Sequence, residues 1–136
     1  MAPSKRLWRH AGLGDMAKAL RFSPDGRALA VGDSDGALTL FDARTGAPTR
    51  TVAEPHTVSA VTFHPTRPWL VFGTFQGRGK ANLRVMDVPS GKVIGSARVD
   101  PFGVYELDIS PDGKWLATAG GDGEVRVLEL AELMGK

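Results

Sequence analysis

Residues 20–30 read LRFSPDGRALA, and residues 107–117 repeat this phrase as LDISPDGKWLA. A looser copy, VTFHPTRPWLV, occupies residues 61–71. The prolines of the three copies, Pro24, Pro65 and Pro111, are 41 and 46 residues apart. Self-similarity at such a period is typical of repeat proteins, in which each unit mainly buries the face of its neighbour. The sequence therefore predicts three copies of one structural unit.

Short strands joined by tight turns are expected in each unit. In the first unit, residues 17–22 alternate small or apolar residues with polar ones, which indicates a strand with one buried face. The Ser-Pro-Asp-Gly sequence at 23–26 predicts a turn, because proline presets one backbone angle and glycine accepts a positive φ. Further strands are predicted at 29–32 and 37–42, and an outer strand at 48–52, where a proline suits a sheet edge.

The other two units follow the same order. From Ser23 to Asp42 and from Ser110 to Glu129, eight of the twenty aligned residues are identical. Strands are predicted here at 69–73, 83–87, 93–96, 115–118 and 125–128. Glycine or proline recurs roughly every 8 to 12 residues, which disfavours a helical repeat. We therefore expect an all-β fold of four-stranded antiparallel sheets, with one short helical turn within residues 128–134, which are good helix formers.

These residues resemble the WD-repeat β-propeller family over nearly the whole chain. The resemblance is carried by the Ser-Pro-Asp-Gly turn, by the Asp-Gly turn between the second and third strands, and by an apolar–acidic pair that ends the third strand. That pair appears as Phe41-Asp42, Met86-Asp87 and Leu128-Glu129, so the family's tryptophan is absent each time. The resemblance implies three propeller blades in one domain over residues 1–136, with repeats at roughly 5–42, 47–87 and 92–130.

Three blades raise the question of closure, because known propellers typically have four to eight blades. The chain is predicted to be a partial propeller or half of a six-bladed ring that a homodimer completes. In the dimer hypothesis, residues 5–9 form an outer strand anchored by Trp8, and this strand pairs with the edge at 125–130 of a second copy. The alternative is a fragment or structural remnant of a longer propeller.

Equivalent positions in the units predict which side chains pack between blades. Leu29, Leu70 and Leu116 follow the repeated turn at matching places, and we expect all three to be buried. Trp69 and Trp115 also occupy equivalent places, which indicates either packing between blades or a shared exposed patch, and the repetition favours packing.

Composition excludes several classes of site and partner. The chain has no cysteine, which excludes disulfides, thiolate metal sites and a cysteine nucleophile. The 17 Lys and Arg are interspersed with 15 Asp and Glu, so the basic stripe of a nucleic-acid binder is absent. No apolar run approaches the roughly 18 residues that span a bilayer, and none follows the basic N-terminus as in a secretory signal. We expect no nucleic-acid or membrane partner and a cytoplasmic location.

No catalytic, cofactor or metal site is predicted. No two of His10, His56 and His64 have the spacing of a metal-binding pair, and His64 replaces the serine of its turn, where it is expected on the surface. Asp25 and Asp112 lie in turns, where carboxylates usually accept hydrogen bonds from their own backbone. Nothing singles out a nucleophile or a base, so we expect no enzyme activity.

A partner-binding site is predicted at the turn between the second and third strands of the middle unit. Residues 76–80 lengthen this turn, and functional residues concentrate on loops that a rigid scaffold holds. Phe75, Arg78 and Lys80 are the candidate partner-binding residues, suited to an acidic peptide or a phosphate. The resulting hypothesis is a non-catalytic protein–protein interaction or scaffold module.

Two alternatives remain open at this point. The added residues could be an ordinary solvated loop, and the chain could be a fragment of a hydrolase-like propeller enzyme. Histidines and carboxylates clustered on one rim would favour the enzyme, whereas exposed aromatic and basic residues there would favour the interaction module.

Overall fold

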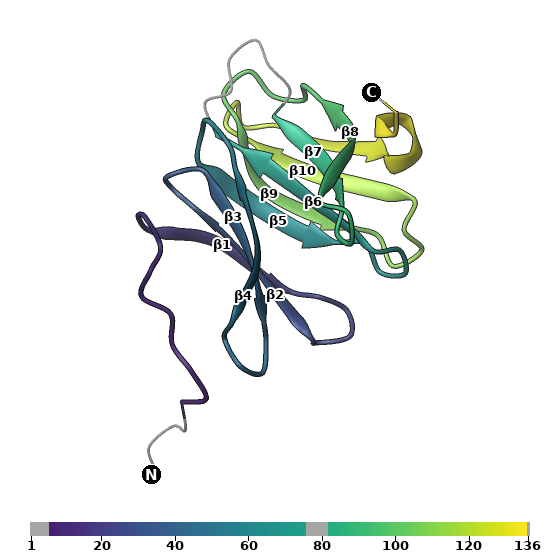
Figure 1. Ribbon diagram of the computed structural model, residues 1–136. Coiled ribbons are helices and arrows are strands. Elements are labelled where there is room, and N and C mark those ends of the chain that lie inside the picture. The colour runs from purple at the N-terminus through teal and green to yellow at the C-terminus, as the bar shows by residue number, and fades with distance from the viewer. Residues whose placement is uncertain (1–5, 76–81, 136) are drawn as a thin grey trace, which may run out of the picture.

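Three antiparallel sheets make up the fold (Figure 1). The computed structural model describes residues 6–75 and 82–135, which contain eleven strands and one short 3-10 helix. No helix in this part of the chain is long and apolar enough to cross a membrane.

The strands follow the chain order within each sheet. Blade 1 contains β1 (Ala17–Phe22), β2 (Ala28–Asp33), β3 (Ala37–Asp42) and β4 (Pro48–Ala53). Blade 2 contains β5 (Val58–Phe63), β6 (Trp69–Thr74), β7 (Leu83–Asp87) and β8 (Lys92–Ala97). Blade 3 contains β9 (Val104–Ile109), β10 (Trp115–Gly120) and β11 (Val125–Glu129), followed by the 3-10 helix η1 (Leu130–Leu133). The all-β fold with propeller-type blades is confirmed.

The repeated turn forms equivalent hairpin connections in blades 1 and 3. The N–H of Gly26 donates to the carbonyl of Ser23 at 2.9 Å, and the N–H of Gly113 donates to the carbonyl of Ser110 at 2.8 Å. Both glycines have positive φ, +73° and +77°. Glycine adopts this conformation without the steric cost that a Cβ would add, so the predicted role of the turn is confirmed.

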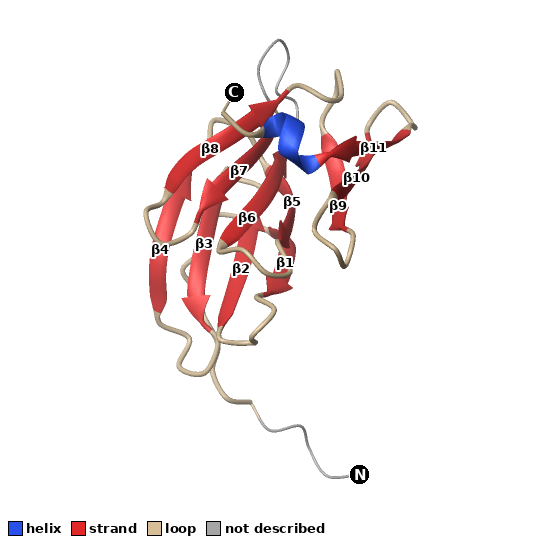
Figure 2. Cartoon of the chain, turned by 90° about the vertical axis from the view of Figure 1, so that its right-hand side faces the viewer, coloured by secondary structure: helices blue, strands red, loops and turns tan. Residues whose placement is uncertain are grey.

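The blades stack face to face in chain order, with blade 2 in the middle (Figures 1 and 2). Strand β5 packs between β1 and β9, so the first strand of each blade lies along the inner edge of the stack. One apolar core fills the space between blades 1 and 2 and a second fills the space between blades 2 and 3. Blade 2 is therefore covered on both faces, while blades 1 and 3 each have one face without a neighbouring blade.

The stacking of the blades explains how deeply each of the three equivalent leucines is buried. In the strand register, Leu29 lies opposite Phe22, Leu70 opposite Phe63 and Leu116 opposite Ile109, so the three positions match. Leu70 and Leu116 are fully buried, as predicted. Leu29 is only half-buried, so the prediction is wrong for this residue, because its side of blade 1 has no preceding blade.

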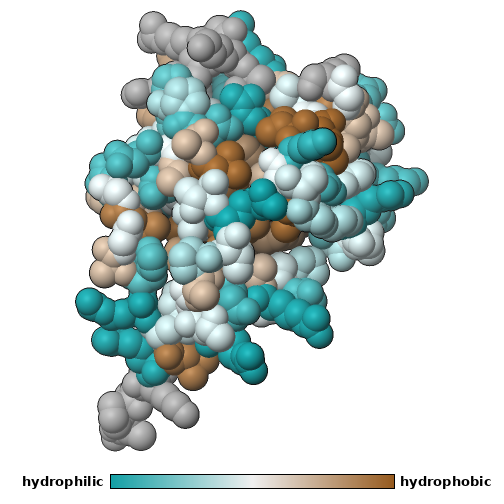
Figure 3. Space-filling model, in the orientation of Figure 1, coloured by the Kyte–Doolittle hydropathy of each residue, from teal (hydrophilic) through white to brown (hydrophobic). Residues whose placement is uncertain are grey.

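Blade 3 has three strands, so the prediction of four strands in every unit is wrong here. After β11 the chain forms the predicted helical turn, η1, whose Leu130 and Leu133 are buried in the core between blades 2 and 3. The chain then reaches the outer strand of blade 2, where Met134 bridges to Gly95. Figure 3 shows hydrophobic atoms gathered near β8 on the face in view. The last segment therefore fastens blade 3 to blade 2 instead of adding a fourth strand.

The N-terminal segment also differs from its prediction. Residues 6–9 form no strand. The Trp8 indole N–H donates to the carbonyl of Ala43 at 2.7 Å, and its ring lies 5.8 Å from the ring of Phe41. The His10 ring contacts Phe41 as well, at 4.9 Å. Trp8 thus anchors this segment to blade 1 of its own chain, which satisfies the indole donor and covers part of the open face.

Replacing Leu116 with Ala should lower the free energy of unfolding by about 2 to 5 kcal/mol, the range for a truncated core leucine. Leu29→Ala at the matching position should cost clearly less, because Leu29 is only half-buried. Urea denaturation of both variants measures the difference. Equal losses of stability would contradict the stacking of the blades described above.

Candidate partner-binding site

Phe75 is the first residue after β6 and begins the connection to β7. Its N–H donates to the carbonyl of Thr57 at 2.9 Å, and the residue forms an isolated β-bridge with Gly103. Its ring lies 5.0 Å from the ring of Tyr105 on β9, tilted by 34°. The structure therefore brings the predicted Phe75 together with an aromatic residue of blade 3. Arg78 and Lys80 lie outside the described residues.

Two further aromatic side chains extend this surface. Phe102, in the connection before β9, is 50% exposed, and Tyr105 is 52% exposed. Both lie against Gly121, where an added Cβ would come within 2.9 Å of the Phe102 Cβ and 3.3 Å of Tyr105 Cε2. We call Phe75, Phe102 and Tyr105 the aromatic rim. These rings lie at the end of the blades where the β6–β7 and β10–β11 connections meet the links between blades.

A buried carboxylate holds the backbone that carries Phe102. Asp100 Oδ1 accepts the N–H groups of Phe102 and Gly103 at 2.7 and 2.8 Å. Asp100 Oδ2 accepts a hydrogen bond from Arg126 Nη1 at 3.3 Å, and the Asn82 side chain donates to the Asp100 carbonyl. These bonds hold the backbone of the link between blades 2 and 3, and with it the position of Phe102.

Arg126, on β11, belongs to an ion-pair cluster that includes Asp100 of this link. Its Nη2 lies 2.6 Å from Asp122 Oδ2 and 2.8 Å from Glu124 Oε2. The hydrogen bond from Arg126 holds the pKa of Asp122 far below its usual range. Because Arg126 also donates to Asp100, the cluster ties the β10–β11 turn to the link between blades 2 and 3.

The carboxylates of the repeated turn act locally, as predicted. Asp25 Oδ1 accepts the Ser23 hydroxyl at 2.6 Å and the Arg27 N–H at 2.9 Å. These bonds, the one from Ser23 above all, lower the pKa of Asp25, and Asp112 has a lowered pKa for the corresponding reason. Both carboxylates stabilise their own turns.

His64 is buried, so its predicted place on the surface is wrong. Its Nδ1 accepts the N–H groups of Thr66 and Arg67 at 3.1 and 3.0 Å, as the serine hydroxyls of the other turns accept backbone N–H groups. The ring is covered because the turn of blade 3 lies over it at Gly113. Burial lowers the pKa of His64, which favours the neutral imidazole.

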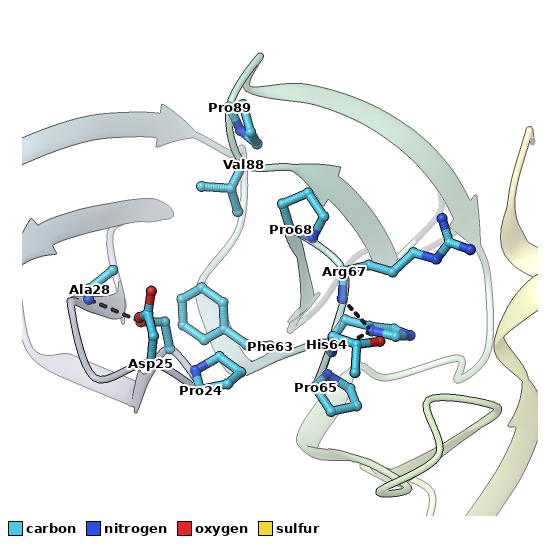
Figure 4. A pocket seen from close by; sticks show the side chains of 12 residues that line it. Pro24, Asp25, Ala28, Phe63, His64, Pro65, Arg67, Pro68, Val88 and Pro89 are labelled. Carbon is cyan, nitrogen blue, oxygen red and sulfur yellow. Dashed lines mark hydrogen bonds between the residues drawn. The ribbon is translucent and has the colours of Figure 1, made fainter.

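A groove of about 420 Å³ lies between blades 1 and 2 on the rim opposite the aromatic rim (Figure 4). Its walls include Phe63 and the four prolines Pro24, Pro65, Pro68 and Pro89. Asp25 and His64 also line the groove, but their acceptor atoms bind their own turns. Within residues 6–75 and 82–135, no three metal-ligating side chains gather at one place. The acceptor atoms of Asp25 and His64 in the groove therefore stabilise the turns to which they belong.

The sequence prediction missed Phe102 and Tyr105, although the repeat contains a signal for them. The register and the hydrogen bonds of the links align Phe102 with His56 and Tyr105 with Ser59. Aromatic residues thus occupy two positions at the start of blade 3, one in the link and one on β9, that are polar at the start of blade 2. Comparing the two links position by position could have identified the pair.

Two family models match the chain. The model described as "Anaphase-promoting complex subunit 4 WD40 domain" matches residues 3–66, which include all of blade 1 and β5. The model described as "WD domain, G-beta repeat" matches residues 89–128, which include β8 and most of blade 3.

Curated proteins with similar sequences include Small ribosomal subunit protein RACK1 of Schizosaccharomyces pombe, which is 27% identical over 132 residues. The alignment covers 90% of this chain and 40% of the relative. THO complex subunit 3 of Arabidopsis thaliana is 24% identical over 115 residues, which cover 85% of this chain and 35% of the relative. A stretch of 26 residues is 73% identical to Protein hir-1 of Neurospora crassa and covers 19% of this chain and 2% of that protein.

The chain spans less than half the length of the first two relatives. The two family models fall on different blades, and both describe WD-type repeats. Because these matches coincide with the stacked blades and with the repeated turn, the chain belongs to the WD-repeat family.

Proposed function

We propose that residues 1–136 act as a non-catalytic protein-interaction module that binds a protein partner on the aromatic rim. The observation that carries this proposal is the pair of half-exposed rings, Phe102 and Tyr105, beside Phe75 on a rigid edge of the blades. Aromatic side chains are enriched at protein interfaces and dominate their binding energy. Large apolar side chains gathered on an exposed surface commonly mark such an interface.

Basic residues that follow Phe75 in the sequence favour an acidic partner. Arg78 and Lys80 follow Phe75 within five residues in the sequence. A carboxylate-rich segment could pair with them while its apolar residues contact the rings. The interspersed charges of the chain, with a net charge of only +2, support a protein partner over a nucleic acid.

The relatives support a role within assemblies. The name of one relative describes a ribosomal subunit protein, and the name of the other describes a subunit of the THO complex. Both names are those of components of larger complexes. A scaffold that presents a docking surface is compatible with this, and we include a cytoplasmic location in the proposal because the chain has no cysteine.

A second copy of the chain is the other partner in this proposal, with two chains completing a ring of six blades. Its support is the open face that blades 1 and 3 each present, since an exposed apolar face is an aggregation liability unless something covers it.

Replacing Tyr105 or Phe102 with Ala should weaken partner binding by roughly tenfold or more, because each ring is a candidate hot spot. Peptides selected from a random library on the immobilised chain provide the ligand, and fluorescence anisotropy measures the Kd of each variant. Val93→Ala is the control, since Val93 is an exposed apolar residue on β8, away from the rim and from the open faces of the outer blades. An equal loss of affinity in the control, or none in the rim variants, would contradict the rim as the docking site.

The double variant Arg78→Ala, Lys80→Ala should bind the same peptides more weakly without lowering thermal stability. Added salt should reduce wild-type affinity in the same direction, because exposed charges are screened over about 8 Å at physiological ionic strength. Unchanged affinity in the double variant at low salt would show that Arg78 and Lys80 do not contribute to binding.

A further inference from the structure

Blade 3 keeps a packing surface that no part of the described chain covers. Val125 and Val127 on β11 are 75% and 62% exposed. In the strand register they occupy the positions that Leu83 and Val85 hold on β7 of blade 2, where both side chains are fully buried. The same positions of blade 1, Leu38 and Leu40, are buried as well. In both other blades, these side chains pack against the next blade.

Trp115 on β10 is likewise more exposed than its equivalent in blade 2. Its register position matches that of Trp69, since each tryptophan lies opposite the acidic residue that ends the following strand. Trp69 packs against the core between blades 2 and 3, whereas Trp115 is 46% exposed. The open face of blade 3 therefore retains the apolar residues of a blade-to-blade contact.

Blade 1 has the complementary open face. Leu20 and Phe22 on β1 are 56% and 62% exposed. Leu20 matches Val61 of blade 2 and Leu107 of blade 3 in register, and both of those are almost fully buried against the preceding blade. The open face of blade 1 thus carries the residues that pack against the preceding blade in blades 2 and 3. The open face of blade 3 carries the residues that pack against the following blade in blades 1 and 2.

The inner strands of the two outer blades carry opposite charges. Lys18 and Arg21 lie on β1, and Glu106 and Asp108 lie on β9. Arg21 and Glu106 pair within the chain, with 3.2 Å between Nη2 and Oε1. Lys18 and Asp108 are exposed, and neither forms an ion pair within the described part of the chain.

We infer that blade 3 of one chain packs its open face onto the open face of blade 1 of a second copy, and that two such contacts close a six-bladed ring. This inference rests on the proposed pairing of two copies and specifies the surfaces that meet. It continues the interface that blades 1 and 2 and blades 2 and 3 already form within the chain. A head-to-tail contact repeated about a two-fold axis closes, and six blades fall within the known range.

The N-terminal segment covers part of the blade 1 face, because Phe41 matches Met86 of the contact between blades 1 and 2. Trp8 and His10 cover Phe41 on β3, toward the outer part of the blade 1 face. They leave Leu20 and Phe22 of the inner strand exposed. The docking surface is therefore the inner part of the face, and no strand from the N-terminus is required.

Light scattering coupled to size-exclusion chromatography tests the pairing on the full chain. The wild type should have twice the 14.5 kDa mass of one chain. Val127→Asp on blade 3 and Phe22→Asp on blade 1 should each raise the dimer Kd by roughly a hundredfold, since each places an unpaired carboxylate in an apolar contact. Val93→Asp is the control, because Val93 is 47% exposed on β8 and belongs to neither open face.

Mixing the two interface variants tests the head-to-tail geometry. Val127→Asp retains an intact blade 1 face, and Phe22→Asp retains an intact blade 3 face, so an equimolar mixture recovers one good contact. A heterodimer should form in the mixture, although each variant alone is monomeric. Circular dichroism should show an unchanged strand content for Val127→Asp, Phe22→Asp and the control Val93→Asp. Trp115→Glu provides a second blade 3 variant if Val127→Asp fails to fold.

A wild-type chain that stays monomeric, a dimer that survives both interface variants, or a mass that grows beyond two chains would each overturn the inference. The rim experiment is separate, because Tyr105→Ala should leave the dimer mass unchanged and Val127→Asp should leave peptide binding unchanged. Failure of one result therefore does not imply failure of the other.

Discussion

Each blade of this chain depends on a neighbouring blade to cover its apolar face. A single sheet of short strands has too little buried area to be stable alone, and face-to-face packing supplies it. Blade 2 shows the complete arrangement, because Leu83 and Val85 pack toward blade 3 while Leu70 and Phe72 pack toward blade 1. The outer blades satisfy this requirement on one side only. The exposed Val125 and Phe22 follow directly from it.

The two ends of the described chain cover apolar surface in different ways. The N-terminal segment lays Trp8 against Phe41, so that part of the blade 1 face is protected. The C-terminal segment buries Leu130 and Leu133 between blades 2 and 3 and joins the edge of β8. Neither segment reaches the β11 side of blade 3. This asymmetry leaves the blade 3 face as the more open of the two surfaces.

The stacked sheets also determine what their connections can do. Asp100 is buried in the link between blades 2 and 3, where its carboxylate accepts two backbone N–H groups and so holds the link in place. The link in turn places Phe102 beside Tyr105 on the rim. By contrast, the polar atoms in the groove on the other rim bind their own turns, as Asp25 does. The stack therefore presents half-exposed rings on one rim and open apolar faces on its two outer blades.

The sequence by itself determined the number of units, the places of the turns and most of the strands. These features depend on neighbouring residues: proline and glycine set the turn at 23–26, and alternation of apolar and polar residues indicates the strands. It also predicted a partner-binding role for Phe75, but only the fold brings Phe75 beside Tyr105 of another blade. Which side chains are covered was decided only by the tertiary structure. Leu29 and Leu70 are equivalent in sequence, and His64 looks like an exposed turn residue, yet their burial depends on whether another blade lies across them. Local chemistry specifies each blade, whereas burial depends on contacts between residues that are far apart in the chain.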